Sequence, residues 1–351
     1  MINNQEWTLN HDLEMVITQA KENFLKLDGS RLFITGGTGF IGCWFLESLK
    51  YAIESFNLNI KATILTRSTK AFNLKAPHLA SYKNFNFFEG ELLTAKFPNT
   101  HYTHIIHAAT ESSADLNENN PLLMFNTIVT GTKKILDFAV ERKINKVLFL
   151  SSGAIYGRQP WELERVKESW YGDVNCVDPK LTYAEAKRAA EMLCAIYKKQ
   201  FGINTAIARI FALLGPYISL DIHFAAGNFI RDALQGKEII VNGNGRPFRS
   251  YLYAGDLIIW LWHLLLNADN SEPYNVGSDE MISIKDLAQK VSNLIGNNGF
   301  RILGDEDDGW NIGRYVPDTR KIAKHYGLKK IVTLDDSILR TAYWHGWKGK
   351  R

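Results

Sequence analysis

Cysteine is scarce in this sequence, which has three in 351 residues, at Cys43, Cys176 and Cys194. Their odd number and irregular spacing argue against a disulfide framework and against a zinc site, so we expect no bound metal. Few cysteines are typical of a reducing compartment, and we expect a cytoplasmic protein. The first residues lack a basic stretch followed by an apolar run, so we predict no signal peptide.

Long apolar runs and an excess of one charge are also absent. The most apolar stretch, residues 257–266, has about half the length that a bilayer span requires and predicts a buried helix. Lys and Arg number 41 against 37 Asp and Glu, for a formal net charge of +4. Because this excess is small and scattered, we expect neither a membrane nor a nucleic-acid partner, whereas a few well-placed arginines would bind a small anion.

The chain contains instead an alternation of short apolar strands and amphipathic helices. This alternation is typical of the α/β class, with a doubly wound parallel sheet and helices on both of its faces. We predict helices at residues 10–27, 40–51, 121–140 and 179–199, and strands at residues 31–35, 60–66, 85–89, 104–108, 146–151 and 205–210.

The alternation becomes irregular in the last third of the chain. We therefore predict a first domain at residues 1–211 and a smaller, mixed domain at residues 212–351. We leave open whether residues of about 240–265 return to the first domain. Within the second domain, Ser283 and Asp286 form the capping-box pattern that opens a helix.

A glycine cluster, TGGTGFIG, follows the first strand directly and opens the next helix. Glycines there let the backbone turn tightly and approach a pyrophosphate, and the helix N-terminus offers free amides and a positive dipole end. With a strand before it and a helix after it, the cluster predicts a dinucleotide-binding Rossmann domain. Its residues expected at the cofactor are Gly36, Thr38, Gly39, Phe40, Ile41 and Gly42.

The end of the second strand, Thr66-Arg67-Ser68, predicts which dinucleotide binds. An acid about 20 residues after the glycines would hold the ribose 2′-hydroxyl of NAD. Here Arg67 can pair with a 2′-phosphate instead, and Ser68 can hydrogen-bond it. We predict a preference for NADP(H), with NAD(H) possible; the alternative interpretation of Arg67 is a solvated surface residue.

Tyr183 and Lys187 are four residues apart on a predicted helix, so they share one face of it. A free phenol has a pKa of about 10, and a nearby ammonium favours the phenolate and lowers that pKa. Ser151 and Ser152 end a strand earlier in the chain, at the carboxyl edge of the sheet where α/β proteins bind ligands. A serine hydroxyl there can polarise a carbonyl that Tyr183 protonates, which predicts acid–base chemistry.

In this order, the glycine cluster, the serine pair and the Tyr-x-x-x-Lys motif resemble the extended short-chain dehydrogenases/reductases, the NAD-dependent epimerase/dehydratase family. Further matches are HAA at 107–109, SSGAIYG at 151–157 and YAEAK at 183–187, so the resemblance covers nearly the whole chain. It implies an enzyme that binds a nucleotide-diphosphate sugar between its two domains. It also implies a homodimer formed by helices 121–140 and 179–199, with apolar residues such as Leu136, Met192 and Ile196 either at its interface or, as the alternative, packed on the sheet.

The resemblance also assigns roles to single residues. It makes Ser152 the catalytic serine beside Tyr183 and Lys187. The cofactor would further contact Glu91, Leu92, Ala108, Ala109, Asn126 and Ser151, and the substrate would contact Thr110, Ser152, Arg249 and Arg314. The family usually has an Asn after Arg-x-Phe, where Ala212 stands here, and we expect Asn228 to contact the substrate in its place. The two arginines would grip the diphosphate bidentately.

One departure from the family bears on the reaction. The dehydratases and the decarboxylase carry an acid after the catalytic hydroxyl, whereas Gly153 and Ala154 stand here and cannot move a proton. This departure leaves reduction of a keto sugar and 4-epimerisation open. Arg67 argues against tightly held NAD, and SSGAIYG and GNFIRDAL at 227–234 resemble the 4-ketoreductases that convert dTDP-4-dehydro-6-deoxyglucose to dTDP-fucose-type products, so the resemblance implies NADPH-dependent reduction of a 4-keto sugar nucleotide. The alternative is an NAD(P)-dependent sugar-nucleotide 4-epimerase, followed by a decarboxylase or dehydratase.

Overall fold

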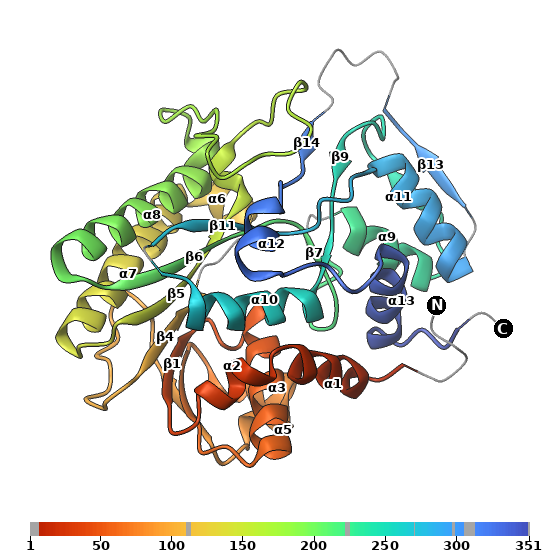
Figure 1. Cartoon of the computed structure of the whole chain (residues 1–351). Helices are drawn as coiled ribbons and strands as arrows, with labels where there is room; N and C mark the ends of the chain where they lie inside the picture. The colour runs from red at the N-terminus through yellow and green to blue at the C-terminus, as the bar shows by residue number, and fades with distance from the viewer. Residues whose placement is uncertain are drawn as a thin grey trace.

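The computed structural model describes residues 7–109, 114–221, 225–269, 271–296, 299–304 and 313–349. Its centre is a seven-stranded parallel sheet in the order β11-β6-β5-β4-β1-β2-β3 (Figure 1). The strands are β1 Arg31–Thr35, β2 Lys61–Thr66, β3 Phe85–Glu89, β4 His104–His107, β5 Lys146–Ser152, β6 Asn204–Ile210 and β11 Pro273–Val276.

Both faces of this sheet are apolar. Successive residues of a strand point to opposite faces, and the strands carry apolar residues at consecutive positions. Phe33 and Ile105 face α7 (Pro121–Glu141) and α8 (Thr182–Phe201). Their neighbours on the strands face α3 (Phe40–Phe56) and α10 (Ala254–Asn267) on the other side. The predicted doubly wound α/β fold is thus confirmed, and the predicted strands differ from the observed ones only by one or two residues at their ends.

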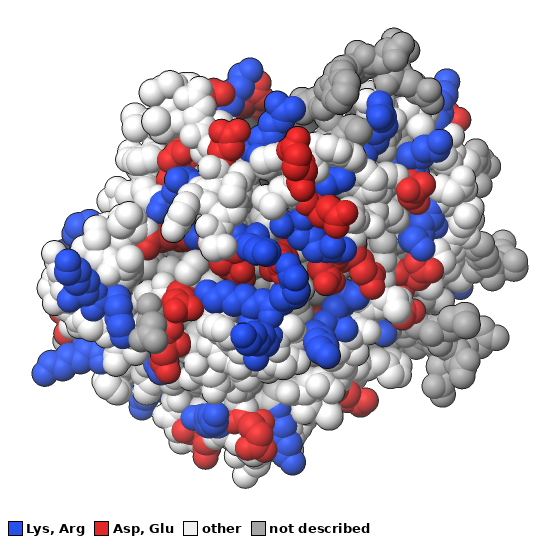
Figure 2. Space-filling view, turned by 45° about the horizontal axis from the view of Figure 1, so that its top comes forward, with Lys and Arg blue, Asp and Glu red and all other residues white. Residues whose placement is uncertain are grey.

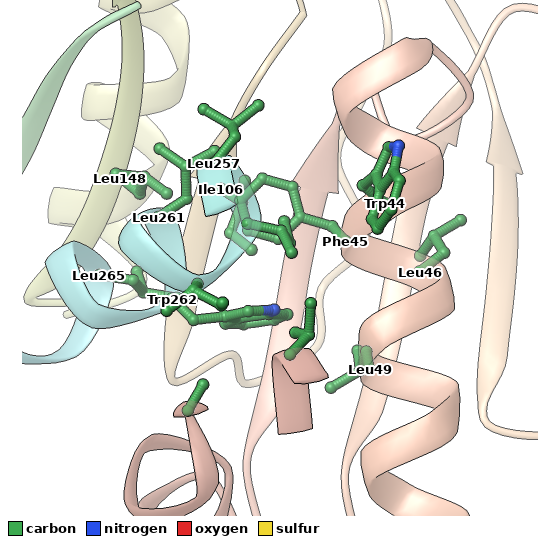
Figure 3. Close-up of a cluster of buried hydrophobic side chains, with 14 of the residues drawn as sticks. Trp44, Phe45, Leu46, Leu49, Ile106, Leu148, Leu257, Leu261, Trp262 and Leu265 are labelled. Atoms are coloured by element: carbon green, nitrogen blue, oxygen red, sulfur yellow. The ribbon is translucent and has the colours of Figure 1, made fainter. Parts of the chain in front are cut away.

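The most apolar stretch of the chain lies in α10, which is buried between α3 and the sheet (Figure 3). The rings of Phe45 and Trp262 meet edge-to-face at 5.0 Å, and the Trp262 indole donates a hydrogen bond to Ser48 Oγ at 2.9 Å. The prediction of a buried helix is therefore confirmed. Within the part of the chain that the structure describes, no helix has the length and apolarity to cross a membrane.

The helix predicted at residues 10–27 is interrupted in the structure. Ala20, with φ −106° and ψ 16°, separates α1 (Leu9–Gln19) from α2 (Lys21–Lys26). The buried Asp12 of α1 accepts hydrogen bonds from Tyr253 and, at 2.5 Å, from Arg340. These contacts attach the N-terminal segment to the C-terminal part of the chain.

The C-terminal third forms a mixed layer beside the large sheet. Ser283 caps α11, its hydroxyl accepting from Asp286 N at 3.0 Å, which confirms the predicted capping pattern. The chain returns to the large sheet through α10 and β11, which pairs with β6. The remaining elements are α4 Thr69–Lys75, α5 Pro77–Ala80, α6 Ala114–Asn119, β7 Leu213–Leu214, α9 Ala225–Leu234, β8 Ile239–Val241, β9 Phe248–Arg249, β10 Leu252–Tyr253, β12 Ile282–Ser283, α11 Ile284–Val291, β13 Phe300–Ile302, β14 Arg314–Tyr315, α12 Arg320–Tyr326 and α13 Leu334–Trp344.

Basic and acidic side chains are interspersed on the face of the molecule that Figure 2 shows. Ion pairs of the described residues include Lys321 with Glu272 at 3.0 Å and Lys290 with Asp335 at 2.6 Å.

Candidate active site

The glycine loop lies where the strand order of the sheet reverses, between β1 and β4. Gly36 has φ +72°, and a Cβ on it would lie 2.5 Å from the Ala108 carbonyl carbon. A Cβ on Gly42 would lie 2.3 Å from the Gly36 oxygen. Only glycine fits these two positions, and the backbone after β4 packs directly against the loop.

The other residues of the loop join it to its neighbours. Gly39 is the N-cap of α3, so the loop opens a helix as predicted, and Phe40 and Ile41 form its first turn. The Thr38 carbonyl accepts from Lys75 Nζ at 2.9 Å. Ala109 N donates to Thr35 Oγ1 at 3.3 Å, which holds the two loops together.

The side chains at the end of β2 are distributed differently from the prediction. Arg67 is exposed, whereas the Ser68 hydroxyl caps α4 by accepting from Ala71 N at 3.1 Å. The carboxylate of Glu89, at the end of β3, accepts from Thr69 Oγ1 at 2.5 Å and Thr69 N at 2.6 Å, and these bonds lower its pKa. An acid therefore stands one strand away from Arg67, a neighbour that the sequence pattern did not indicate.

The remaining expected cofactor and substrate residues are scattered. Glu91 is exposed in the turn after β3, but Leu92 is buried against Gly131 of α7, which makes it a core residue. Asn126 is exposed on α7, and Asn228 accepts from Arg231 Nη1 at 3.2 Å within α9. The predicted substrate residue Thr110 lies outside the described residues.

Three of the predicted catalytic residues come together at the carboxyl end of β5. Ser152 ends β5, and its Oγ accepts from Ala154 N at 3.1 Å. The Tyr183 phenol on α8 is buried close to Ser152, which opposes the rise that burial causes in its pKa. Lys187 Nζ lies 5.9 Å from the centre of the Tyr183 ring and donates to Leu150 O at 2.6 Å. The hydroxyl of residue 183 thus faces the strand end at which the glycine loop also lies.

Burial has the largest effect on the pKa values in this group. Burial lowers the pKa of Lys187 from 10.5 to about 7. Burial raises the pKa of Tyr183, and Ser152 opposes that rise. The Lys187 amine lies beside the Tyr183 ring but is itself buried and donates to a backbone carbonyl, so the expectation that its ammonium makes this phenol more acidic stays a prediction.

Two functional groups that the sequence analysis missed lie next to these residues. The Ser151 hydroxyl donates to Glu191 Oε1 at 2.5 Å. Glu191 in turn pairs with Arg209, and the four-residue spacing from Lys187 to Glu191 was the available signal. The Tyr315 hydroxyl of β14 donates to Ile210 O at 3.5 Å, and Ser152 opposes the rise that burial causes in the pKa of Tyr315; nothing in the sequence pattern indicated this neighbour.

The two arginines expected to clamp a diphosphate do not face each other. β14 pairs with β9 so that Tyr315 lies beside Arg249, and Arg314 lies beside Phe248. Adjacent residues of a strand point to opposite faces, so Arg249 and Arg314 are on opposite faces of this ladder. The Arg314 guanidinium stacks on Trp161 at 3.6 Å and donates to its carbonyl at 2.6 Å. Arg249 Nη1 donates to Phe248 O at 2.8 Å and to Gly313 O at 3.2 Å, next to Arg314 in the chain, and the two-arginine clamp stays a prediction.

A glycine loop at the switch point of a Rossmann sheet, with Ser152, Tyr183 and Lys187 at the same edge, defines the class of short-chain dehydrogenases/reductases. Residues 32–277 match the model of the NAD dependent epimerase/dehydratase family, and the chain belongs to that family. Across the described residues, no group of three or more His, Cys, Asp and Glu side chains is arranged to hold a metal ion.

Known proteins that resemble the chain catalyse three different reactions. UDP-glucuronic acid decarboxylase 1 of Xenopus tropicalis is 29% identical over 318 residues, which cover 90% of this chain and 72% of that protein. The UDP-glucose 4-epimerase of Thermotoga maritima, solved with UDP-glucose, superposes with a TM-score of 0.76 and 20% identity over 90% of this chain and 98% of that one. The dTDP-glucose 4,6-dehydratase of Bacillus anthracis, solved with NAD, has a TM-score of 0.75 and 21% identity over 90% and 96% of the two chains.

These relatives confirm the predicted family and a sugar-nucleotide enzyme of the epimerase, dehydratase and decarboxylase type. They do not support the prediction of a 4-ketoreductase and agree better with the alternative reactions. A nicotinamide cofactor fits the family, and the solved relatives that contain one contain NAD.

Replacing Lys187 by Met should stabilise the fold at pH 7 and abolish turnover. The pKa of Lys187 is about 7 in the folded protein, against 10.5 for a free lysine. Between these two pH values the buried amine has lost its proton while the unfolded chain retains it. The stability of the wild type therefore rises with pH across this range. Methionine has similar length and no charge. We expect urea unfolding to give a gain of about 2 kcal/mol at pH 7 that shrinks toward pH 10.

Lys61→Met, at the exposed start of β2, is the matched control and should leave the pH dependence of stability unchanged. A loss of stability in the Lys187→Met protein at pH 7, or a gain that persists at pH 10, would contradict the burial of a charged amine.

Proposed function

We propose that the chain is a sugar-nucleotide 4-epimerase that oxidises and reduces carbon 4 of the sugar with a bound nicotinamide dinucleotide. The observation that carries this proposal is the group of Ser152, Tyr183 and Lys187 at the end of β5, in which Gly153 and Ala154 follow the serine in place of an acid. Such a group can move one proton at one oxygen, which oxidation and reduction of an alcohol require. The family relatives support a reaction that begins in this way.

The glycine loop fits the cofactor, because Gly36 and Gly42 let its backbone pack against neighbouring backbone and so place the loop at the start of α3, where a pyrophosphate would meet free amides. When bound, the nicotinamide would accept hydride from carbon 4 and return it. Tyr183 would take the proton of the 4-hydroxyl and return it to the ketone oxygen, while Ser152 hydrogen-bonds that oxygen. Lys187, when protonated, would stabilise the phenolate that Tyr183 forms during transfer.

Elimination and decarboxylation have less support from the residues. A Cβ on Gly153 would lie 2.7 Å from the Phe211 ring, so this position after the catalytic serine has no room for an acid side chain. Ala154 has no proton to transfer. The similarity to UDP-glucuronic acid decarboxylases nevertheless makes UDP-glucuronate a required substrate in the test.

Reduction of a 4-keto sugar nucleotide by NADPH is the second candidate. Arg67 and Ser68 at the end of β2 favour it, because an exposed guanidinium at this point can pair with the 2′-phosphate of NADP(H). A reductase needs the same three catalytic residues, so the two candidates differ in whether the cofactor is consumed.

The test is a substrate panel of UDP-glucose, UDP-N-acetylglucosamine, dTDP-glucose and UDP-glucuronate, with and without added NAD or NADP. We expect one neutral sugar to interconvert with its 4-epimer without net change in cofactor absorbance. Tyr183→Phe should lower turnover by at least about 100-fold while it still binds NAD(P)H, because only the transferred proton is lost.

Release of carbon dioxide from UDP-glucuronate would instead establish a decarboxylase. Stoichiometric oxidation of NADPH with a dTDP-linked 4-keto sugar, without epimerisation, would establish the reductase. Near-normal turnover of the Tyr183→Phe variant would overturn the assignment of its phenol.

Arg67 generates a separate prediction about the cofactor. If its guanidinium binds a 2′-phosphate, Arg67→Ala should weaken NADPH binding by about tenfold and leave NADH binding unchanged. The Glu89 carboxylate, which bonds Thr69 two residues after Arg67, would repel a 2′-phosphate. Glu89→Gln should therefore strengthen the binding of NADPH. Fluorescence titration with both reduced cofactors measures this. A wild-type preference for NADH that Arg67→Ala does not alter would contradict the NADP(H) interpretation.

The predicted homodimer also becomes a proposal with a test. On α8 the side chains of Met192 and Ile196 are 62% and 38% exposed, and Leu122 on the neighbouring α7 is 70% exposed. Leu136, in contrast, is buried in the core, so for this residue the alternative of packing on the sheet holds. We expect Met192→Glu to give a monomer in light scattering, because a charge in an apolar interface is costly. Leu74→Glu, at an exposed apolar residue of α4, is the control, and a monomeric wild type would reject the dimer.

A further inference from the structure

A buried ion pair lies one helical turn beyond Lys187 on α8. Tyr183, Lys187 and Glu191 are spaced by four residues, so all three share the face that packs on the sheet. Glu191 and Arg209 of β6 are each only 11% exposed, and Arg209 Nη2 donates to Glu191 Oε2 at 2.7 Å. The proposed chemistry uses neither residue.

We propose that Glu191, fixed by Arg209 and Ser151, is a positioning residue that keeps the buried amine of Lys187 protonated for the proposed oxidation and reduction. The inference rests on the proposed function in that it concerns the same catalytic lysine. It adds a charge-setting role for a residue that does not touch the reacting atoms.

The Glu191 carboxylate is held rigidly from two strands. Ser151 of β5 donates to Oε1 at 2.5 Å, and Arg209 Nε lies 3.1 Å from Oε1 and 3.2 Å from Oε2. Ser151 and Arg209 are partners in the β5–β6 register, so both reach the carboxylate from the same face of the sheet. These donors hold the carboxylate in place one helical turn from Lys187.

Arg209 is itself fixed from its other side. Its Nη1 donates to the Tyr156 hydroxyl at 2.8 Å, and that hydroxyl donates to Asn275 Oδ1 at 2.8 Å. Burial raises the pKa of Tyr156 to about 12, so the phenol stays neutral and does not compete with Glu191 for the guanidinium. The network therefore connects β5, β6, β11 and α8 behind the catalytic residues.

Among the described residues around Lys187, Glu191 is the one whose charge favours the protonated amine most. Burial lowers the pKa of Lys187, and Glu191 and then Cys194 oppose that shift. Cys194 is buried and its thiol pKa is raised, so it is neutral, as is His107 of β4, whose pKa burial lowers to about 3. Tyr183 stays a neutral phenol because burial raises its pKa.

The experiment compares Glu191→Gln with wild type in the pH dependence of NAD(P)H affinity and of kcat/KM. Loss of the carboxylate should lower the pKa of Lys187, so activity and cofactor affinity should fall at a lower pH. With a wild-type pKa of about 7 and a shift of about one unit, kcat/KM should drop about tenfold at pH 8 and only about twofold at pH 6. Glu191→Asp should restore part of the alkaline activity.

Glu185→Gln is the matched control, because it removes one carboxylate from the same helix, where Glu185 pairs with Arg188 at 3.8 Å. Its pH profile should equal that of wild type. The double variant Glu191→Gln with Arg209→Met removes the pair without leaving a buried cation, and its profile should stay shifted.

A wild-type pH profile in Glu191→Gln, or its recovery in the double variant, would show that the pair is only structural and would overturn the proposal. The cofactor titration separates this outcome from a failure of the proposed function. If wild type binds NAD(P)H with a pH dependence that Glu191→Gln shifts, the role of Glu191 stands whichever sugar reaction the enzyme catalyses. If wild type binds neither cofactor, the proposed function itself fails.

Discussion

The burial of one amine is the constraint on which the arrangement of the catalytic residues depends. Lys187 lies between α8 and the sheet, where its nitrogen donates to the Leu150 carbonyl. Burial of a charged group is costly unless other groups compensate for it. The compensation comes from Glu191 on the same helix face, and the position of α8 that allows it also brings Tyr183 to Ser152. The stability of the fold thus favours a neutral Lys187, whereas the proposed reaction needs a protonated one.

A second constraint is the close approach of two loops at the switch point of the sheet. Gly36 and Gly42 have no room for a side chain, since backbone atoms of neighbouring turns occupy the space. The loop can therefore present its amides at the start of α3, at the same edge of the sheet as Ser152. One sheet edge supplies both the expected cofactor site and the hydroxyls, which is why this fold carries oxidation and reduction of alcohols so readily.

The residues predicted to bind the substrate diphosphate lie on short strands that the sequence pattern does not reveal. β9 and β14 are two residues long, and their pairing places Tyr315 next to Arg249 and turns Arg314 to the Trp161 ring. Two-residue strands have no periodicity to read, so the sequence pattern does not indicate on which faces of the ladder the two arginines lie. The same limit applies to Glu89, whose place beside Arg67 depends on the pairing of β2 with β3.

The sequence alone determined the doubly wound fold, the glycine loop and the Ser152, Tyr183 and Lys187 set, because each is encoded in local periodicity or short spacing. Only the tertiary structure decided the charge states and the neighbours across strands. The pKa of Lys187 depends on burial between a helix and a sheet, and the Glu191–Arg209 contact joins residues on different elements. Register and desolvation arise from the packing of distant segments, and no local pattern in the chain records them.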